Sequence, residues 1–133
     1  MNRQPQAWSL AVALVVAAPL AASAGTAENA EYPLKETVEA VVYRGHIVFQ
    51  DYCQKCHGAK ADGDGRAARL YDPHPANLVR SDKNDRYKEA IIRRGGAGMA
   101  RSQFMPPWQD ELTDEQIQDV VGYLRSIAEN PAH

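Results

Sequence analysis

The sequence contains no third cysteine, because only Cys53 and Cys56 carry thiols among its 133 residues. A cysteine-based zinc site would need two further ligands at similar spacing. The histidines His74 and His133 are too scattered along the chain to supply them. A zinc finger is therefore not expected, and a disulfide, a redox dithiol or a cofactor attachment site remain as interpretations of the two cysteines.

The chain also lacks an apolar run long enough to cross a bilayer comfortably. Its longest run, Ala7–Leu20, follows a single basic residue and is followed by the small residues A-S-A at positions 22–24. This order is typical of a secretory signal peptide. We expect residues 1–24 to be removed near Ala24/Gly25, which places the mature protein in the periplasm. An uncleaved membrane anchor is the alternative, and the proline within the run disfavours it.

No basic run is long or interleaved with aromatic residues, so neither DNA nor another nucleic acid is expected as a partner. The charge is nevertheless uneven: residues 52–105 carry +5, whereas residues 25–51 carry −3 and residues 106–133 carry −5. There is no internal repeat. The 109 residues that would remain after cleavage form one small domain with a modest core.

The most informative stretch that is present is C-x-x-C-H, which extends from Cys53 through Cys56 to His57. This motif is the signature of c-type haem attachment, in which each thiol adds to one vinyl group of the haem. The histidine beside the second thioether then presents its imidazole to the iron. A redox dithiol would instead follow a strand in a βαβ pattern, and no strand-like run precedes Cys53. One covalently bound haem c is the expected cofactor.

Apolar periodicity predicts an all-α domain with three helices, over residues 36 or 39 to 52, 81–94, and from 113 to the Asn130-Pro131 pair. Gly45 lies inside the first helix, where glycine usually allows another backbone to come close. Asp82 or Asn84 is the expected N-cap of the second helix. Thr113 and Gln116 form a capping box for the third. The apolar face of that last helix comprises Ile117, Val120, Val121, Leu124 and Ile127.

Between the first two helices, Gly58–Val79 is interrupted by glycines and prolines and shows little periodicity. A loop of this length is explained if it wraps the lower face and edge of a flat cofactor. Its stretch Asp62-Gly63-Asp64-Gly65 is not expected to bind calcium, because the other EF-hand positions and the final glutamate are missing.

Met105 is the candidate for the second axial ligand of the iron. It directly precedes Pro106 and Pro107, which favour an extended and stiff segment able to aim a thioether at the haem face opposite His57. Filling of the core is the alternative role for this methionine. Met99 is the competing ligand, and His74 is a weaker one still.

With these residues identified, the chain resembles a small bacterial class I c-type cytochrome. The similarity rests on G-x-x-x-F from Gly45, C-x-x-C-H-G from Cys53, G-D-G from Gly63, M-P-P-W from Met105 and V-V-G-Y-L from Val120, and it extends over about residues 40–128. The sequence departs from the commonest form at Arg66, where relatives often carry proline.

The resemblance implies a cytochrome c-like fold at residues 36–133. Residues 25–35 lie outside it, and their polar composition predicts a flexible lead-in. It implies that the first and last helices cross near Gly45 and Tyr123. It also implies that Met105 is the distal ligand and that the carbonyl of Pro73 or Pro75 accepts the Nδ1 proton of His57. The pocket is expected to be lined by Phe49, Tyr52, Leu78, Ile91, Phe104, Trp108 and Val121.

The expected function follows from an iron with both axial positions filled: a periplasmic mono-haem carrier that passes single electrons between a redox donor and a redox acceptor, and not an enzyme. Contact with membranes would occur only through partner complexes. Basic residues near the haem edge at Cys53 and Cys56 are hypothesised to dock on an acidic patch of the partner, and ordinary solvated charges are the alternative. The candidates are Lys55, Lys60, Arg66, Arg69 and Arg101.

Two other functional classes stay open at this point. One is a haem subunit permanently attached to a periplasmic dehydrogenase or a terminal oxidase. The other is a haem peroxidase or gas binder with an open iron.

Overall fold

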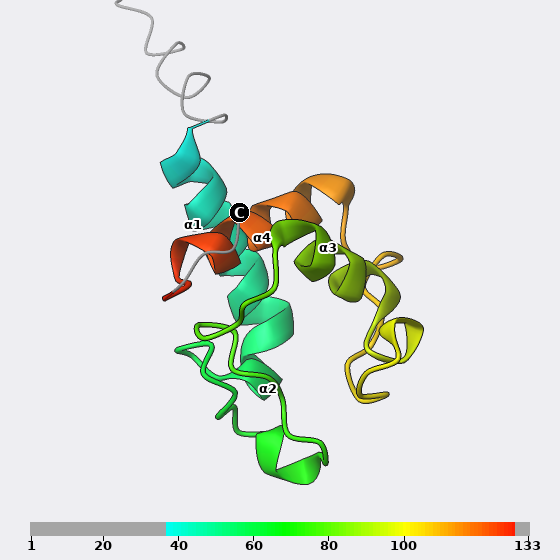
Figure 1. The fold of residues 1–133 in the computed structure, drawn as a ribbon. Coiled ribbons are helices and arrows are strands. Elements are labelled where there is room, and N and C mark those ends of the chain that lie inside the picture. Colours follow the sequence, from blue (N-terminus) through cyan, green and yellow to red (C-terminus); the bar gives the residue numbers. More distant parts are fainter. Residues whose placement is uncertain (1–36, 130–133) are drawn as a thin grey trace, which may run out of the picture.

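A computed structural model describes residues 37–129 of the chain, and within this range it contains helices and no strand. The elements are α1 (Val38–Val48), the π-helical turn η2 (Phe49–Cys53), α2 (Gln54–His57), the 3₁₀ turn η3 (Ala68–Leu70), α3 (Asp85–Arg94), the 3₁₀ turn η4 (Ala97–Met99) and α4 (Asp114–Ser126) (Figure 1). The all-α prediction is confirmed. The expected signal peptide and lead-in lie outside the described residues. The last helix ends at Ser126 with Ile127 as its C-cap, so the expectation that it runs to the Asn130-Pro131 pair is wrong.

The first helix is longer than its periodicity predicted. It begins at Val38, where the Thr37 side chain accepts a hydrogen bond from the Ala40 amide. It does not end at Tyr52, because the backbone continues through the π-helical turn η2 into α2 and stops at His57. A π turn widens the helix by one residue and interrupts the 3.6-residue period. The haem-attachment motif is therefore the end of one continuous helical rod.

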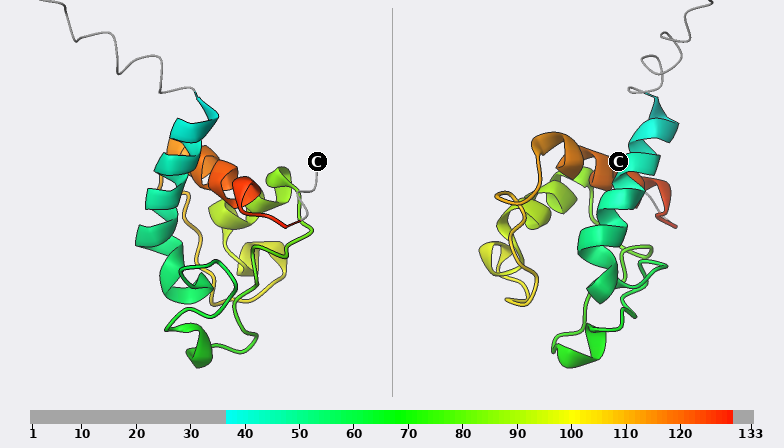
Figure 2. Two further views of the ribbon diagram at one scale, coloured as in Figure 1. Left: turned by 90° about the vertical axis from the view of Figure 1, so that its left-hand side faces the viewer. Right: turned by 180° about the vertical axis from the view of Figure 1, so that it is seen from behind.

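Helices α1 and α4 cross at a glycine, as the sequence predicted (Figure 2). A Cβ atom on Gly45 would collide with the main-chain carbonyl of Asp119 and would lie 2.8 Å from the Cβ of Tyr123. The Tyr123 ring packs against His46 and Phe49, with centroid distances of 5.1 and 5.3 Å. The absence of a side chain at Gly45 is thus what allows the two backbones to touch.

A buried ion pair fixes the orientation of the same crossing. The Arg44 guanidinium donates two hydrogen bonds to the carboxylate of Asp119, of 2.7 and 2.8 Å. Asp119 is 4% exposed, so its charge depends on this partner instead of on water. Glu115, one helical turn earlier, lies 4.0 Å from the same guanidinium.

Replacing Asp119 with alanine is expected to lower the free energy of unfolding by on the order of 3 kcal/mol, because it leaves the guanidinium of Arg44 half-buried beside a lost partner. Denaturant unfolding of the haem-loaded protein measures this. Arg80→Gln is the control, since its ion pair with Glu129 joins two exposed side chains and is worth little. Equal losses in the two variants would contradict a special role for the Arg44 pair.

The other two main helices match their predicted caps. The Thr113 and Gln116 capping box of α4 is present in full. In α3 the cap is Asn84, whose side chain accepts from the Tyr87 amide, so the helix begins at Asp85 and not at Ser81. The largest fully buried side chains are Phe49, Ile117 and Val120, which places the core between α1 and α4. Among residues 37–129 no helix is long and apolar enough to cross a membrane.

Candidate haem site

The loop after the motif closes back on the short helix α2. Amides of Gly63, Gly65 and Ala67 donate to the carbonyls of His57, Cys56 and Lys55 at 2.8, 3.1 and 3.0 Å. These carbonyls are the unpaired acceptors at the end of a helix, so the loop satisfies them. A Cβ on Gly65 would lie 2.5 Å from the Cys56 carbonyl, which explains the glycine. The neighbouring Arg66, where the resemblance is imperfect, is exposed.

The ring of His57 is held by the main chain. Its Nδ1 lies 2.9 Å from the carbonyl oxygen of Ala76. The expectation that Pro73 or Pro75 supplies this carbonyl is wrong, because the carbonyl of Pro75 faces Gly63 and the next peptide unit turns toward His57. Burial lowers the pKa of His57, opposed by the hydrogen bond to Ala76. The imidazole is therefore kept neutral. Its Nδ1–H donates to the Ala76 carbonyl, and Nε2 is the nitrogen that remains to bind a metal.

Replacing Gly63 with alanine tests the role of the hydrogen bond from His57 to the Ala76 carbonyl without changing either partner. Gly63 has φ +91°, and a Cβ there would lie 2.6 Å from the carbonyl oxygen of Pro75, so the Pro75–Ala76 segment must move. Weakening the hydrogen bond makes the imidazole a poorer donor, so the reduction potential is expected to rise, with a stability loss of about 1–2 kcal/mol for the left-handed backbone. Optical redox titration measures the potential. Gly98→Ala, in the exposed turn η4, should leave it unchanged.

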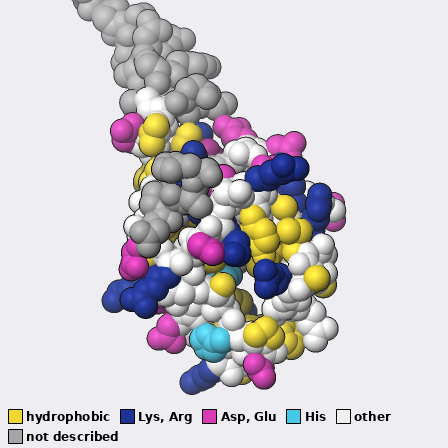
Figure 3. Space-filling view, viewed as in Figure 1, with side chains coloured by type: hydrophobic (Ala, Val, Ile, Leu, Met, Phe, Trp, Pro, Cys, Tyr) yellow, Lys and Arg dark blue, Asp and Glu magenta, His cyan; other side chains and the backbone are white. Residues whose placement is uncertain are grey.

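A large apolar cavity opens between His57 on one side and helix α3 on the other (Figure 3). Its volume is about 520 Å³, within the range of cofactor sites. Six of the seven predicted lining residues are on its wall, namely Phe49, Tyr52, Leu78, Ile91, Phe104 and Trp108. The prediction was wrong for Val121, which is buried in the α1–α4 core, and Leu124 lines the cavity in its place.

The structure brings all four predicted haem-binding residues to this one cavity: Cys53, Cys56, His57 and Met105. Burial, with a smaller contribution from Cys56, raises the pKa of the Cys53 thiol to about 12. A redox dithiol needs a lowered thiol pKa, so the surroundings of Cys53 disfavour that interpretation.

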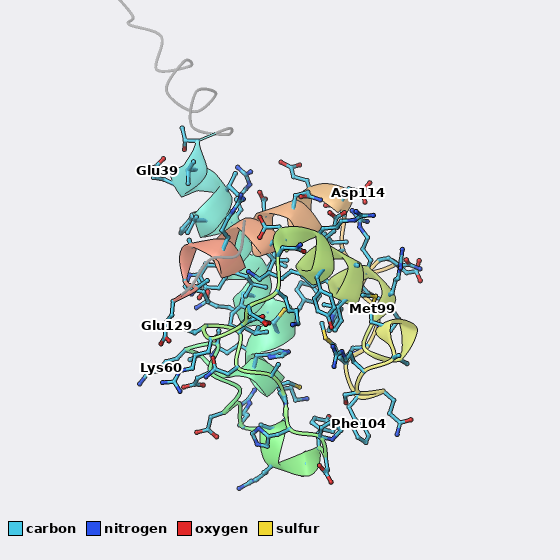
Figure 4. The ribbon with its side chains drawn as sticks, in the orientation of Figure 1. Glu39, Lys60, Met99, Phe104, Asp114 and Glu129 are labelled. Atoms are coloured by element: carbon cyan, nitrogen blue, oxygen red, sulfur yellow. The ribbon has the colours of Figure 1, made fainter. Side chains whose placement is uncertain are left out.

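Met105 reaches the cavity from a segment pinned to the end of α3. The Gly96 amide donates to the Met105 carbonyl at 2.8 Å, and the Trp108 amide donates to the Ile92 carbonyl at 2.9 Å. Met99 lies in η4 and does not line the cavity, although it belongs to the same loop as Phe104 (Figure 4). The other competitor, His74, does line the cavity as an exposed residue of the opposite loop.

Sequence reasoning missed two features of the rim. Tyr71 packs against Phe104 across the opening, with ring centroids 5.0 Å apart. Arg101 donates from Nε to the hydroxyl of Tyr87 at 3.2 Å, which joins α3 to the loop before Met105. An aromatic residue directly before Asp72-Pro73 was the available signal for Tyr71. Nothing in the sequence pairs Tyr87 with Arg101.

The residues present fit a haem. A broad apolar cavity holds two thiols and an imidazole on one wall and a thioether on another, and these are the groups that c-type attachment and axial ligation require. The imidazole has a fixed tautomer, as a metal-binding histidine needs.

Comparisons with known proteins agree with this chemistry. The family model described as cytochrome c oxidase, cbb3-type, subunit III, matches residues 40–124. The cbb3-type cytochrome c oxidase subunit FixP of Sinorhizobium medicae is 30% identical over 91% of this chain, and that of Rhizobium meliloti is 28% identical over the same share. One subunit of the nicotinate dehydrogenase of Pseudomonas putida is 28% identical over 66% of this chain. This chain spans 44% of the FixP sequences and 8% of the dehydrogenase subunit.

Two solved structures share the fold. A chain of the reducing HAO-like protein complex of Kuenenia stuttgartiensis superposes with a TM-score of 0.55 at 29% identity, covering 68% of this chain and 46% of that one. Cytochrome cL of Methylophaga aminisulfidivorans superposes with a TM-score of 0.50 at 23% identity, covering 70% and 59%. The match to the family model and the fold together show that this chain belongs to the cytochrome c family, in the branch described for subunit III of cbb3-type oxidases, and binds haem c covalently.

Proposed function

We propose that the protein is a periplasmic mono-haem cytochrome that carries single electrons between redox proteins. Cys53 and Cys56 would attach the haem through thioethers, and His57 and Met105 would bind its iron from opposite sides. The observation that carries this proposal is the convergence of these four side chains, from the end of the α1–α2 rod and from the segment after α3, on one apolar cavity.

Each part of the chain has a separate task in this proposal. Haem c supplies a reversible one-electron Fe(II)/Fe(III) couple when bound. The Ala76 carbonyl holds the Nδ1 proton of His57 and so fixes the donor nitrogen. The thioether of Met105 favours the reduced state compared with a second nitrogen ligand, and the apolar wall excludes water and raises the potential further. If His57 and Met105 both hold the iron, no position would be left for a substrate, and electron transfer through the haem edge would be the remaining chemistry.

A second candidate is a haem subunit or domain of an oxidoreductase complex. It is favoured because the relatives are named as subunits of an oxidase and of a dehydrogenase, and because this chain spans less than half of the FixP sequences. The two candidates share the same site and differ in whether the protein travels alone. Size-exclusion chromatography of the native protein from a detergent-solubilised whole-cell extract distinguishes them, because a carrier elutes alone and a subunit elutes with its complex.

An optical redox titration of the purified native protein tests the site. The expected result is one haem, a single one-electron transition and a near-infrared band from methionine bound to ferric iron. A colourless protein made with the full maturation machinery would overturn the proposal. Ready binding of carbon monoxide at neutral pH would instead support an open-site peroxidase or gas binder.

The partner surface is proposed to be the basic face around the motif. Lys55, Lys60, Arg66 and Arg69 are all exposed, and none forms an ion pair with a carboxylate in the part of the chain that the structure describes. Such a patch attracts an acidic partner at long range.

We expect the second-order rate of electron transfer to the native partner to fall as ionic strength rises, and to fall at low salt in the Lys55→Gln, Lys60→Gln double variant. Stopped-flow mixing at several salt concentrations measures both effects. The Arg86→Gln, Arg94→Gln double variant, with two exposed changes on α3, is the control for total charge. Rates that do not depend on salt would leave these residues as ordinary solvated charges.

A further inference from the structure

The segment that carries Met105 is held unevenly along its length. From the Met105 carbonyl onward it is fixed by main-chain bonds of 2.8 and 2.9 Å to Gly96 and to helix α3. The Trp108 ring adds an edge-on contact with Tyr52, with centroids 5.5 Å apart. Before that carbonyl, the amides of Phe104 and Met105 make longer bonds, of 3.3 and 3.4 Å, within their own turn. This earlier half of the segment therefore needs a support from elsewhere.

The ring of Phe104 finds such a support on the opposite loop (Figure 4). It packs against the ring of Tyr71 with centroids 5.0 Å apart and planes inclined by 34°, within the range of favourable aromatic pairs. Tyr71 follows η3, on the loop that also carries the Ala76 carbonyl bonded to His57. In the part of the chain that the structure describes, no main-chain hydrogen bond joins this loop to residues 95–107. The aromatic pair is thus the contact that connects the two loops at this edge of the cavity.

The pair lies at the rim of the cavity and not in the core. Phe104 is 43% exposed. The core and the side chains packed against it include Met105 and Trp108 but neither Phe104 nor Tyr71. Losing the contact should therefore change the position of the Met105 segment more than the stability of the whole fold.

We propose that Tyr71, by packing on Phe104, holds Met105 in the position of an axial ligand. An aromatic pair stabilises only the arrangement in which both rings meet, and here that arrangement fixes the residue directly before the thioether. This inference rests on the proposed function. It makes Tyr71 a positioning residue for the second axial ligand, contributed by the loop that supports the first.

The Tyr71→Ala variant should let the Met105 segment open more often. A ligand that competes with Met105 for the ferric iron binds in proportion to the open fraction. Imidazole should therefore bind ferric Tyr71→Ala about tenfold more tightly than wild type, equivalent to about 1.4 kcal/mol. Absorption spectra during an imidazole titration measure the affinity. Before imidazole is added, the near-infrared methionine band should be present in both proteins.

Three further variants separate the contact from other effects. Tyr71→Phe should keep the wild-type affinity, because the ring makes the contact. Leu70→Ala is the matched control, since it removes a neighbouring apolar side chain that is 71% exposed and does not line the cavity. Phe104→Ala should reproduce Tyr71→Ala, and combining the two should add nothing, because both remove the same contact. If Tyr71→Ala does not mature with haem, Phe104→Ala carries the test.

The Met105→Ala background shows whether the effect passes through the methionine. Imidazole has no thioether to displace there, so adding Tyr71→Ala should change the affinity by less than about twofold. A tenfold change that persists would mean that Tyr71 acts on the pocket itself, and the inference would be wrong. Equal imidazole affinities in wild type, Tyr71→Ala and Phe104→Ala would overturn it as well.

Docking of a redox partner on the same rings would give a different pattern. Imidazole affinity would stay unchanged, while the second-order rate of electron transfer to the native partner would fall in both Tyr71→Ala and Leu70→Ala. That result would replace the inference with a docking surface. None of these outcomes contradicts the proposed function while the wild-type protein shows its near-infrared band. Absence of that band in the wild type would overturn the ligation by Met105, and this inference with it.

Discussion

The Met105→Ala variant is expected to lose the near-infrared methionine band and to show a reduction potential lower by on the order of 0.1 V, since axial ligands shift haem potentials over a range of about 0.8 V. Met105 is on the cavity wall and is the proposed second ligand, so its removal would leave one face of the iron open. The variant should therefore also bind carbon monoxide in the reduced state. Absorption spectroscopy with an optical redox titration measures all three changes.

Met99→Ala is the matched control for this experiment. It removes the same side chain six residues earlier, from the turn η4 that does not reach the cavity. Its band and potential should equal those of the wild type. The reverse pattern, with the band lost in Met99→Ala and kept in Met105→Ala, would assign the ligand to Met99 and contradict the proposed site.

The Gly45→Ala variant is expected to lose about 3 kcal/mol or more of unfolding free energy, although alanine is the better helix former by about 1 kcal/mol. The added Cβ collides with the main-chain carbonyl of Asp119, and a backbone atom cannot rotate away. The helices must separate, which disturbs the core beside Tyr123 and the Arg44 ion pair. Denaturant unfolding of the haem-loaded protein measures the loss.

Gly122→Ala provides the comparison on the facing helix. A Cβ there would lie 2.6 Å from a methyl group of Val41 and 3.9 Å from the guanidinium of Arg125, and both contacts are with side chains, which can shift more readily than a backbone carbonyl. This variant should be close to neutral because the gain in helix propensity offsets the adjustment. Similar losses in the two alanine variants would show that the crossing tolerates separation and that Gly45 is not essential to it.

The parts of the fold that the sequence predicts well are those that depend on particular side chains. The C-x-x-C-H motif, the Thr113 capping box and the glycine at the helix crossing each have a distinct residue type at a fixed spacing. The methionine before two prolines is such a signal too, and the structure places it on the cavity wall. Its bond to the iron stays a prediction.

The features that could not be predicted depend on main-chain groups and on the path of the main chain. Every residue has a carbonyl, so no side chain marks Ala76 as the partner of His57. The nearby Pro73 and Pro75 were therefore predicted in its place. The end of the first helix was misplaced because the π turn adds a residue to the helix, so the regular apolar spacing that predicts a helix does not continue past Tyr52.

Residues that share one apolar face are also hard to divide between two environments. Val121 and Leu124 are both buried on α4, yet only Leu124 borders the cavity. Which of them does so depends on where the two long loops lie, and helical periodicity contains no information about that. The hydrogen bond between Arg101 and Tyr87 could not be predicted for the same reason, because it depends on the path of the loop between Gly95 and Met105.

The two walls of the cavity differ in how they are secured. On the His57 side, the end of a helix is capped by hydrogen bonds from the loop that follows it. On the other side, the Met105 segment is held to α3 by only a few main-chain hydrogen bonds. Under mild heating the second wall should detach first, while the pigment stays tethered to the first. Early damage to this molecule would then appear as exchange of the sulfur ligand for water in a protein that is still red, long before the chain as a whole unfolds.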